Sequence, residues 1–391
     1  MPTKSEKHLA AYTLHNTPQL IRGGKKYFDL LLKLINTARQ SIHFQVYIFD
    51  EDETGKMIAE ALMLAAKRNV RVFLMVDGYG STRLSAGFIE QILKAGIQFK
   101  MFEPIFFTKH FYFGRRLHHK VVVVDAQHSL VSGINISDKY NDTGDNPAWL
   151  DWGLYVEGEA AIELLIVCIR VWTRSASKAR KLFSFEKLPE TLPQEKCMVR
   201  VRRNDWVRRL TQINASYLEM FRKANSHIVI MSSYFLPGLI FKQRLGRAAK
   251  RGVKIKLILA GISDVNLSKH AERYIYRWLL RHNIEIYELQ KTILHGKLAT
   301  YDGEFVTLGS YNVNNISAYV SLELNLDVRE KEFALSVDKE LERIIKQDCI
   351  QITEKDCRHF NFIQRVSQYT AYTAIRFMYF ISTFYFKQRN L

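Results

Sequence analysis

The chain has 391 residues, of which 47% are hydrophobic and 25% charged, a balance typical of a globular protein long enough for two domains. Lysine and arginine number 57 against 39 aspartates and glutamates, so the formal net charge is +18 at pH 7. A surface this basic attracts polyanions, either nucleic acid or a membrane rich in anionic lipid, and composition does not decide between them.

The cysteines argue against a zinc or redox site, and the N-terminal segment argues against a secretion signal. No two of the four cysteines form a CxxC pair, so neither a zinc site nor a redox dithiol is indicated, and free thiols in a reducing compartment are expected. The segment MPTKSEKHLAAYTLHN has no apolar core, which predicts no signal peptide. No uninterrupted apolar run reaches about 18 residues, so no clear membrane-spanning helix is expected.

The first half of the chain alternates apolar strands with helices. ARQSIHFQVYIFDEDETG (38–55) predicts the end of a helix and a strand. AAKRNVRVFLMVDG, which begins at residue 65, predicts a basic helix end, a short turn and a buried strand. This alternation indicates a largely parallel sheet covered by helices.

An aromatic and basic stretch follows, PIFFTKHFYFGRRL (104–117). Aromatic side chains mixed with lysine and arginine are typical of an element at a membrane interface. Since it runs directly into the next strand, it could admit a lipid headgroup there. The alternative, a strand and turn packed within the domain, stays open.

The next strand opens with a histidine and a lysine, in RRLHHKVVVVDAQHSLVSGIN (115–135). Positions i and i+2 of a strand face the same side, so His118 and Lys120 project together. His119 faces the other side, and we expect it to be a packing or surface residue. An ordinary buried strand has no use for Lys120, so the pair is a candidate site.

The second half of the chain repeats the first. ANSHIVIMSSYFLPG (224–238) corresponds to the first strand segment, and AAKRGVKIKLILAG, at residue 248, repeats the second after 183 residues. The stretch SFEKLPETLPQEK (184–196), which bears proline and lysine, is the expected linker between a first lobe, 1–183, and a second, 197–360.

The histidine–lysine motif is repeated as well, in LHGKLATYDGEFVTLGSYN (294–312). Each copy has the spacing HxKxxxxD and is followed by an asparagine. The matching residues are His118, Lys120, Asp125 and Asn135 in the first copy and His295, Lys297, Asp302 and Asn312 in the second. One such match is weak, but two at the same place in a repeated lobe are strong.

Two lobes related by a pseudo-twofold axis could bring both motifs into one shared site. Such a site suits a phosphate, because lysines supply positive charge and asparagine amides supply directed hydrogen bonds. One histidine could attack phosphorus while the other protonates the leaving oxygen, since the pKa of histidine lies near neutrality. No metal and no cofactor is expected, because the lysines neutralise the developing charge.

These motifs resemble those of the phospholipase D superfamily, over nearly the whole chain. The closer likeness is to bacterial cardiolipin synthases of the B type, which lack the N-terminal membrane spans of the main form. It is carried by both motif strands and by segments such as IFDEDETGK (48–56), VDGYGS (76–81) and DWGLYVEG (151–158). Ser132 in SGIN departs from the GGxN or GSxN of many relatives, although Gly133 and Asn135 are retained.

The resemblance implies an α/β fold and a role for each motif residue. His118 would be the nucleophile and His295 the general acid and base, while Lys120, Lys297, Asn135 and Asn312 would hold the phosphate. The resemblance implies that Asp125 and Asp302 complete the motifs and support the site rather than react. Asp151 and Glu323 stand where relatives place the carboxylates that orient the histidines, and which acid serves which histidine is left open.

The C-terminal segment 361–391 is rich in aromatic residues, as VSQYTAYTAIRFMYFISTFYFKQRN (366–390) shows. Arg376 would cost roughly 2.5–3.5 kcal/mol at the centre of a bilayer, which argues against a spanning helix. We expect a helix that lies in the membrane surface, and the alternative is a helix packed on the protein core.

The activity that the resemblance implies is cardiolipin synthesis from two phosphatidylglycerol molecules through a phosphatidyl-histidine. The protein would lie peripherally on the cytoplasmic side of the cell membrane, bound to anionic lipid and not to nucleic acid, and one chain would suffice without an oligomer. A phospholipase D hydrolase would use the same residues with water as the acceptor. A nuclease would use them on a nucleic-acid phosphodiester, and a catalytically idle membrane scaffold would not use them at all.

Overall fold

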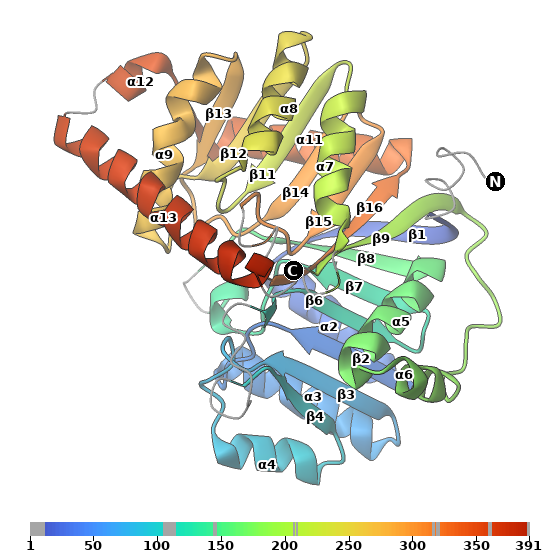
Figure 1. The fold of residues 1–391 in the computed structure, drawn as a ribbon. Coiled ribbons are helices and arrows are strands. Elements are labelled where there is room, and N and C mark those ends of the chain that lie inside the picture. The colour runs from blue at the N-terminus through green and yellow to red at the C-terminus, as the bar shows by residue number, and fades with distance from the viewer. Residues whose placement is uncertain are drawn as a thin grey trace. The chain divides into compact units, whose positions relative to one another are not determined.

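A computed structural model describes residues 12–104, 115–143, 147–205, 208, 210–314, 317, 321–358 and 362–388, with the backbone alone for 358 and 379–388. The chain divides into two compact units: Met1–Arg202 with Leu308–Ser310 and Leu324–Glu330, and Arg203–Thr307 with Tyr311–Glu323 and Lys331–Leu391. Each unit carries one copy of the motif on an α/β framework, which confirms the predicted pair of similar lobes (Figure 1).

The first unit is built on one mixed sheet with the strand order β4-β3-β2-β6-β7-β8-β1-β9. Its strands are β1 (Thr13–Arg22), β2 (Ser41–Val46), β3 (Arg71–Asp77), β4 (Gln98–Phe102), β6 (Lys120–Val124), β7 (His128–Ser132), β8 (Trp152–Gly158) and β9 (Lys196–Asp205), and a short strand β5 (Arg116–Leu117) precedes the motif. Only β2, β3 and β4 are parallel. Beyond β2 the pairs are antiparallel, so the expectation of a mostly parallel sheet is wrong there. For β6 and β7 the physical reason is a tight turn at Asp125 and Ala126, both with positive φ, that joins the two strands directly.

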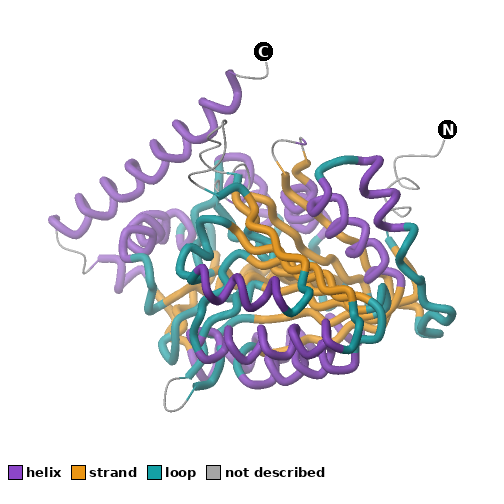
Figure 2. Tube along the Cα trace, turned by 90° about the horizontal axis from the view of Figure 1, so that it is seen from below, coloured by secondary structure: helices purple, strands orange, loops and turns teal. Residues whose placement is uncertain are grey.

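Helices cover both faces of this sheet (Figure 2). They are α2 (Lys25–Thr37), α3 (Glu53–Lys67), α4 (Ala86–Lys94), α5 (Glu159–Thr173) and α6 (Ala176–Phe183). The first three bury their apolar faces in one core with Phe44, Val122 and Val124. On the opposite face, the carbonyl of Cys168 in α5 accepts a hydrogen bond of 2.8 Å from Gln45.

The four-valine run of β6 is explained by this double cover. Val122 and Val124 lie in the core beneath α2 and α3, while Val121 and Val123 are buried on the other face. A strand covered on both faces has a continuous apolar run rather than alternating residues. His119 lies on the α5 side, buried, with its Nε2 2.8 Å from Oε1 of Gln45, which confirms that it is a packing residue.

The second unit repeats the plan with the order β17-β13-β12-β11-β14. Here β11, β12 and β13 are parallel, and β14 is antiparallel to β11. The strands assigned in this half are β10 (Leu210–Thr211), β11 (His227–Ser232), β12 (Lys254–Ala260), β13 (Ile284–Leu289), β14 (Lys297–Tyr301), β15 (Phe305–Gly309), β16 (Ser321–Arg329) and β17 (Cys349–Ile352). The last part of β16, from Leu324 onward, belongs to the first unit.

The helices of this half are α7 (Gln212–Lys223), α8 (Leu239–Lys250), α9 (Asn266–Leu280), α11 (Lys331–Asp348), α12 (Glu354–Arg358) and α13 (Phe362–Gln388). The C-terminal helix α13 lies across α9 (Figure 1) and buries Ala371 and Ile375 with Ala271 and Leu236. It therefore packs on the protein through one face, while Phe362, Ile363, Tyr369 and Phe377 are exposed. Among the described residues, no helix has the length and apolar character needed to cross a membrane.

Candidate active site

The first half-site lies at the edge of the sheet where β2 ends. Because β6 runs antiparallel to β2, Lys120 at its start comes level with the end of β2, and Tyr47 follows β2 there. The rings of Tyr47 and His118 lie with centroids 5.0 Å apart, and Lys120 Nζ lies 5.2 Å from the Tyr47 ring. The buried Lys120 ammonium also donates to the carbonyl of His118 at 2.6 Å. Histidine, lysine and tyrosine thus form one cluster, and His118 is only half-buried.

Asp77 fixes the segment that leads into His118. Its carboxylate is fully buried at the end of β3 and accepts the backbone N–H of Leu117 at 2.7 Å. The N–H groups of Tyr79 and Gly80 bind its other oxygen at 2.9 and 3.0 Å. Burial raises the pKa of Asp77, and these hydrogen bonds oppose the rise. Asp77 lies in VDGYGS, yet the sequence assigned it no role. The feature that could have identified Asp77 is its position at the end of a buried strand, at the same edge of the sheet as His118 and Lys120.

The second half-site repeats the arrangement at the end of β11. Lys297 opens β14 opposite Ser232, the last residue of β11. Its ammonium donates to the carbonyl of His295 and lies 3.0 Å from His295 Nδ1. Both side chains are buried here, whereas His118 keeps some contact with solvent. The two copies therefore share a lysine that binds its own histidine segment.

Each motif asparagine is held by a loop, the one that follows β2 in the first unit and the one that follows β11 in the second. In the first unit, Asn135 Oδ1 accepts the N–H of Ile48 at 3.1 Å, and its Nδ2 donates to the Tyr140 hydroxyl at 2.9 Å. In the second, the Ser233 hydroxyl donates to Asn312 Oδ1 at 2.8 Å. With its oxygen bound, each carboxamide retains at least one N–H donor that can be directed at an anion.

The loop that carries Ser233 is itself anchored by a buried carboxylate. Glu272 in α9 accepts the N–H of Phe235 at 3.0 Å and also binds Lys269 at 3.0 Å. Burial raises the pKa of Glu272, and the Lys269 charge opposes that rise. A buried carboxylate is stabilised by such a fully bonded arrangement, which keeps the loop in one position. Neither Ser233 nor Glu272 was singled out from the sequence, because both contacts join distant parts of the chain.

The aspartate of each motif lies away from its histidine and lysine. Asp125 follows the last residue of β6, about 16 Å along the strand from Lys120. Its carboxylate accepts the N–H groups of Arg39, Gln40 and Ser41 at 2.8, 2.8 and 3.0 Å. These groups stand at the start of β2, at the opposite edge of the sheet.

Asp302 does the same in the second unit. It accepts the N–H groups of Asn225, Ser226 and His227 at 2.8, 2.9 and 2.8 Å, ahead of and at the start of β11. Asp125 and Asp302 share a positive φ of 52°. The motif thus joins two edges of the sheet: the histidine and lysine at one, and an aspartate that binds the backbone at the other.

The two acids expected to orient the histidines are both buried. Asp151 directly precedes β8, and its Oδ1 accepts the N–H of Trp152 at 2.7 Å. A Cβ atom added at Gly133 would lie 2.5 Å from both carboxylate oxygens of Asp151, so glycine is required in SGIN. Glu323 lies in β16, also buried. Their pairing with particular histidines stays a prediction.

Most of the aromatic stretch 104–117 falls outside the described residues, which omit 105–114. At its described end, Arg116 lies over the ring of Tyr79, 5.4 Å from its centroid, and its Nη1 lies 3.8 Å from Asp77. Tyr79 is 57% exposed. The interpretation of this stretch as a membrane-interface element stays a prediction.

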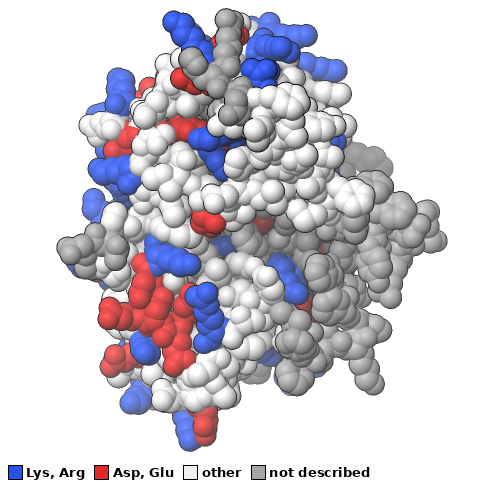
Figure 3. Space-filling model, turned by 90° about the vertical axis from the view of Figure 1, so that its left-hand side faces the viewer, with Lys and Arg blue, Asp and Glu red and all other residues white. Residues whose placement is uncertain are grey.

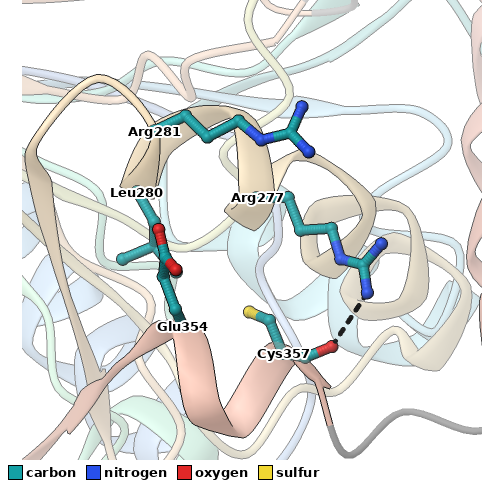
Figure 4. Close-up of a pocket in the computed structure, with 5 residues that line it drawn as sticks. All are labelled: Arg277, Leu280, Arg281, Glu354 and Cys357. Atoms are coloured by element: carbon teal, nitrogen blue, oxygen red, sulfur yellow. Dashed lines mark hydrogen bonds between the residues drawn. The ribbon is translucent and has the colours of Figure 1, made fainter.

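A separate cavity of about 260 Å³ lies between α9 and α12 (Figure 4). It is lined by Arg277 of α9, Arg281 directly after α9, and Glu354 and Cys357 of α12, and Arg277 donates to the Cys357 carbonyl at 3.2 Å. It contains no motif residue. Burial raises the pKa of the Cys357 thiol, so this cysteine is not an activated nucleophile.

Comparison with known proteins decides the family. A family model described as "Cardiolipin synthase, PLD-like domain" matches residues 31–149 and 217–345, one match in each half. The chain belongs to this family. The relatives include cardiolipin synthase B of Escherichia coli K12, 30% identical over 342 residues, which are 87% of this chain and 83% of the relative. Cardiolipin synthase B of Salmonella typhi is 31% identical over 343 residues, with the same coverage.

Solved structures support the fold. The phosphatidylserine synthase of Haemophilus influenzae Rd KW20 superposes with a TM-score of 0.72 over 89% of this chain and 91% of its own, at 14% identity. The polyphosphate kinase of Porphyromonas gingivalis gives 0.57 over 93% of this chain and 53% of its own, at 16% identity. At such low identity, these two similarities support the fold of the chain and say nothing about its activity.

Proposed function

We propose that the protein is a cardiolipin synthase that transfers a phosphatidyl group from one phosphatidylglycerol to another and releases glycerol. The observation that carries the proposal is the pair of equivalent half-sites, each with a histidine, a buried lysine and a held asparagine, in a chain of this family. The named activity of the relatives, which match over most of the chain, supports the choice of substrate.

In the first step, His118 attacks phosphorus of the donor lipid, and the bond from phosphorus to the glycerol oxygen breaks. His295 gives a proton to that oxygen, so glycerol leaves and a phosphatidyl-histidine forms. The ammonium groups of Lys120 and Lys297 stabilise the charge on the phosphate oxygens, with the amides of Asn135 and Asn312. His118 is assigned the attack because the family implies it, and its partly exposed ring is compatible with that role.

In the second step, the hydroxyl of another phosphatidylglycerol attacks the phosphatidyl-histidine. His295 accepts the hydroxyl proton, the bond from phosphorus to nitrogen breaks, and cardiolipin is released with His118 restored. Transfer exceeds hydrolysis when water is kept from the intermediate, which a site pressed onto the bilayer achieves. Asp151 and Glu323 would hold the imidazoles in the required tautomers.

The lipid substrate places the protein at a membrane. Because no described helix can span a bilayer, we propose peripheral binding, on the cytoplasmic side of the cell membrane. All four cysteines are free, which fits a reducing compartment. The charge is unevenly distributed: the face in Figure 3 has a compact acidic group, separate lysines and arginines, and broad uncharged areas.

The test uses purified protein, phosphatidylglycerol vesicles and excess chelator, with products identified by mass spectrometry. We expect cardiolipin from the wild type and none from His118→Gln or His295→Gln, because one reaction needs both histidines. His128→Gln is the control, since its ring contacts Tyr155 at 2.8 Å and belongs to neither half-site.

Each other outcome has a definite meaning. Phosphatidic acid without cardiolipin would identify a hydrolase. About half the activity in each histidine variant would show two independent sites and refute the shared reaction. Cleavage of nucleic acid but of neither lipid would identify a nuclease.

A further inference from the structure

A basic groove of about 350 Å³ runs between α8 and α9, with no motif residue in it. Its lining combines positive charge with apolar surface. The residues that line it are Leu239, Lys242, Gln243, Gly246, Arg247, Lys250, Trp278 and His282.

Aromatic rings from α9 and from the turn directly after it form one side of this groove. The Trp278 and His282 rings lie with centroids 4.2 Å apart at an interplanar angle of 33°, and His282 Nδ1 donates to the Trp278 carbonyl at 2.8 Å. Gly246 of α8 lets both rings approach, because a Cβ atom there would lie 3.2 Å from His282 and 3.4 Å from Trp278. Lys242 Nζ stands 4.7 Å from the centre of the Trp278 ring.

Three cations line the groove along α8: Lys242, Arg247 and Lys250. Within the described part of the chain, no carboxylate forms an ion pair with any of them. Burial lowers the pKa of Lys242, and the charge of Arg376 in α13 lowers it further. An anion in the groove would relieve this repulsion.

Exposed apolar side chains lie where the groove reaches the edge of the sheet that carries the second half-site. Helix α8 begins shortly after β11, whose last residue pairs with Lys297. Leu239 and Ile240, at its start, are 60% and 62% exposed. The segment after the neighbouring strand β12 adds Ile262, Val265 and Leu267, also exposed. Apolar residues at the edge of a basic groove fit a headgroup layer above acyl chains.

We propose that this groove binds the headgroup phosphate of an anionic phospholipid within a bilayer, while Leu239 and Ile240 enter the acyl boundary. The site is additional to the catalytic phosphate site and rests on the proposed function, because it brings the second half-site edge to the membrane that holds the substrate. Nucleic acid fits less well, since it would leave the exposed leucine and isoleucine in water. Tryptophan at a membrane interface and unpaired cations near anionic lipid are both favourable.

The test compares two charge-matched triple variants. The groove variant carries Lys242→Gln, Arg247→Gln and Lys250→Gln. The control carries Lys33→Gln, Lys67→Gln and Lys94→Gln, three exposed residues on α2, α3 and α4 of the first unit. Binding is measured by cosedimentation with vesicles of equal parts phosphatidylglycerol and phosphatidylcholine.

We expect the groove variant to bind these vesicles about a hundredfold more weakly, roughly fivefold for each cation lost. The control should change far less. Equal losses in both variants would show an effect of net charge alone and overturn the proposal, as would wild-type binding by the groove variant. Loss of oligonucleotide binding with vesicle binding intact would assign the groove to nucleic acid instead. The double variant Leu239→Ser, Ile240→Ser should weaken vesicle binding without any change of charge.

A second measurement separates this proposal from the catalytic one. Dihexanoyl phosphatidylglycerol, used below its micelle concentration, reaches the active site without a bilayer. The groove variant should convert it at the wild-type rate but act poorly on vesicles. If the wild type binds vesicles through the groove yet forms no product from either substrate, the proposed function fails and the docking site stands. If the groove variant loses both activities equally, the docking proposal fails.

Discussion

Replacing the motif aspartate should weaken the fold and leave the chemistry largely intact. Asp125 accepts three backbone N–H groups at the start of β2, and its distance from Lys120 along β6 is about 16 Å. Asparagine tolerates the positive φ and keeps one oxygen for Gln40 and Ser41. Its amide group, however, would face the N–H of Arg39, so two donors meet.

The expected loss follows from this count. One charge-assisted hydrogen bond is lost and the others become neutral, which amounts to about 2 kcal/mol. For a unit of this size, that lowers Tm by about 4–8 °C. Asp29→Asn is the control, because Asp29 is 57% exposed in its pair with Lys25, and such pairs contribute less than about 1 kcal/mol.

The assay combines thermal unfolding with cardiolipin formation at 25 °C, well below either transition. Asp125→Asn should keep kcat within about tenfold of the wild type, whereas His118→Gln should lose about a thousandfold or more at nearly unchanged Tm. The reasoning is wrong if Asp125→Asn keeps its Tm and loses activity as completely as His118→Gln. That result would place Asp125 in the chemistry, despite its position at the other edge of the sheet.

Two further predictions concern close contacts. Gly133→Ala should lower both activity and Tm, because its Cβ would lie 2.5 Å from the Asp151 carboxylate, while Gly87→Ala in α4, where a Cβ meets nothing within 4 Å, should leave both unchanged. The hydrogen bond to Asp338 at 2.9 Å raises the pKa of His227, and burial opposes the rise. The stability that this hydrogen bond supplies is therefore fully present below the pKa of His227 in the unfolded chain, about 6.5. It is lost as pH rises through the higher pKa of His227 in the folded protein. His227→Gln should lower Tm by a few degrees at most at pH 6 and by less at pH 9, since the ring is 34% exposed; a larger drop at pH 9 would contradict this.

Local patterns in the sequence predicted much of the fold. The strands β2, β3, β11 and β12 fall inside the four segments identified as repeats, and the i and i+2 positions correctly paired each histidine with its lysine. These features depend on residues close together in the chain. Duplication added a second copy of each of these segments, which supports the same interpretation in both halves.

Contacts between distant segments could not be predicted in the same way. Asp77 acts on Leu117, 40 residues later, and this contact exists only because β3 ends at the motif edge. The antiparallel part of the sheet was missed because alternating strands and helices suggest parallel pairing, whereas Asp125 closes a tight turn between β6 and β7. Alternation in sequence does not reveal a hairpin whose turn lacks glycine and proline.

The separation of two edges in each sheet connects these results. At one edge of the second unit lie Lys297, the held Asn312 and the start of α8; at the other lie Asp302 and the pair of His227 with Asp338. Substitutions of the motif residues at the first edge should therefore change catalysis, whereas those of Asp302 or His227 at the second should change stability. A lipid-binding groove that reaches the first edge through Leu239 can bring substrate to the histidine without disturbing the contacts that hold the strands. An enzyme whose substrate never leaves the bilayer needs its docking surface within reach of the catalytic edge, and Leu239 gives the groove beside α8 that position.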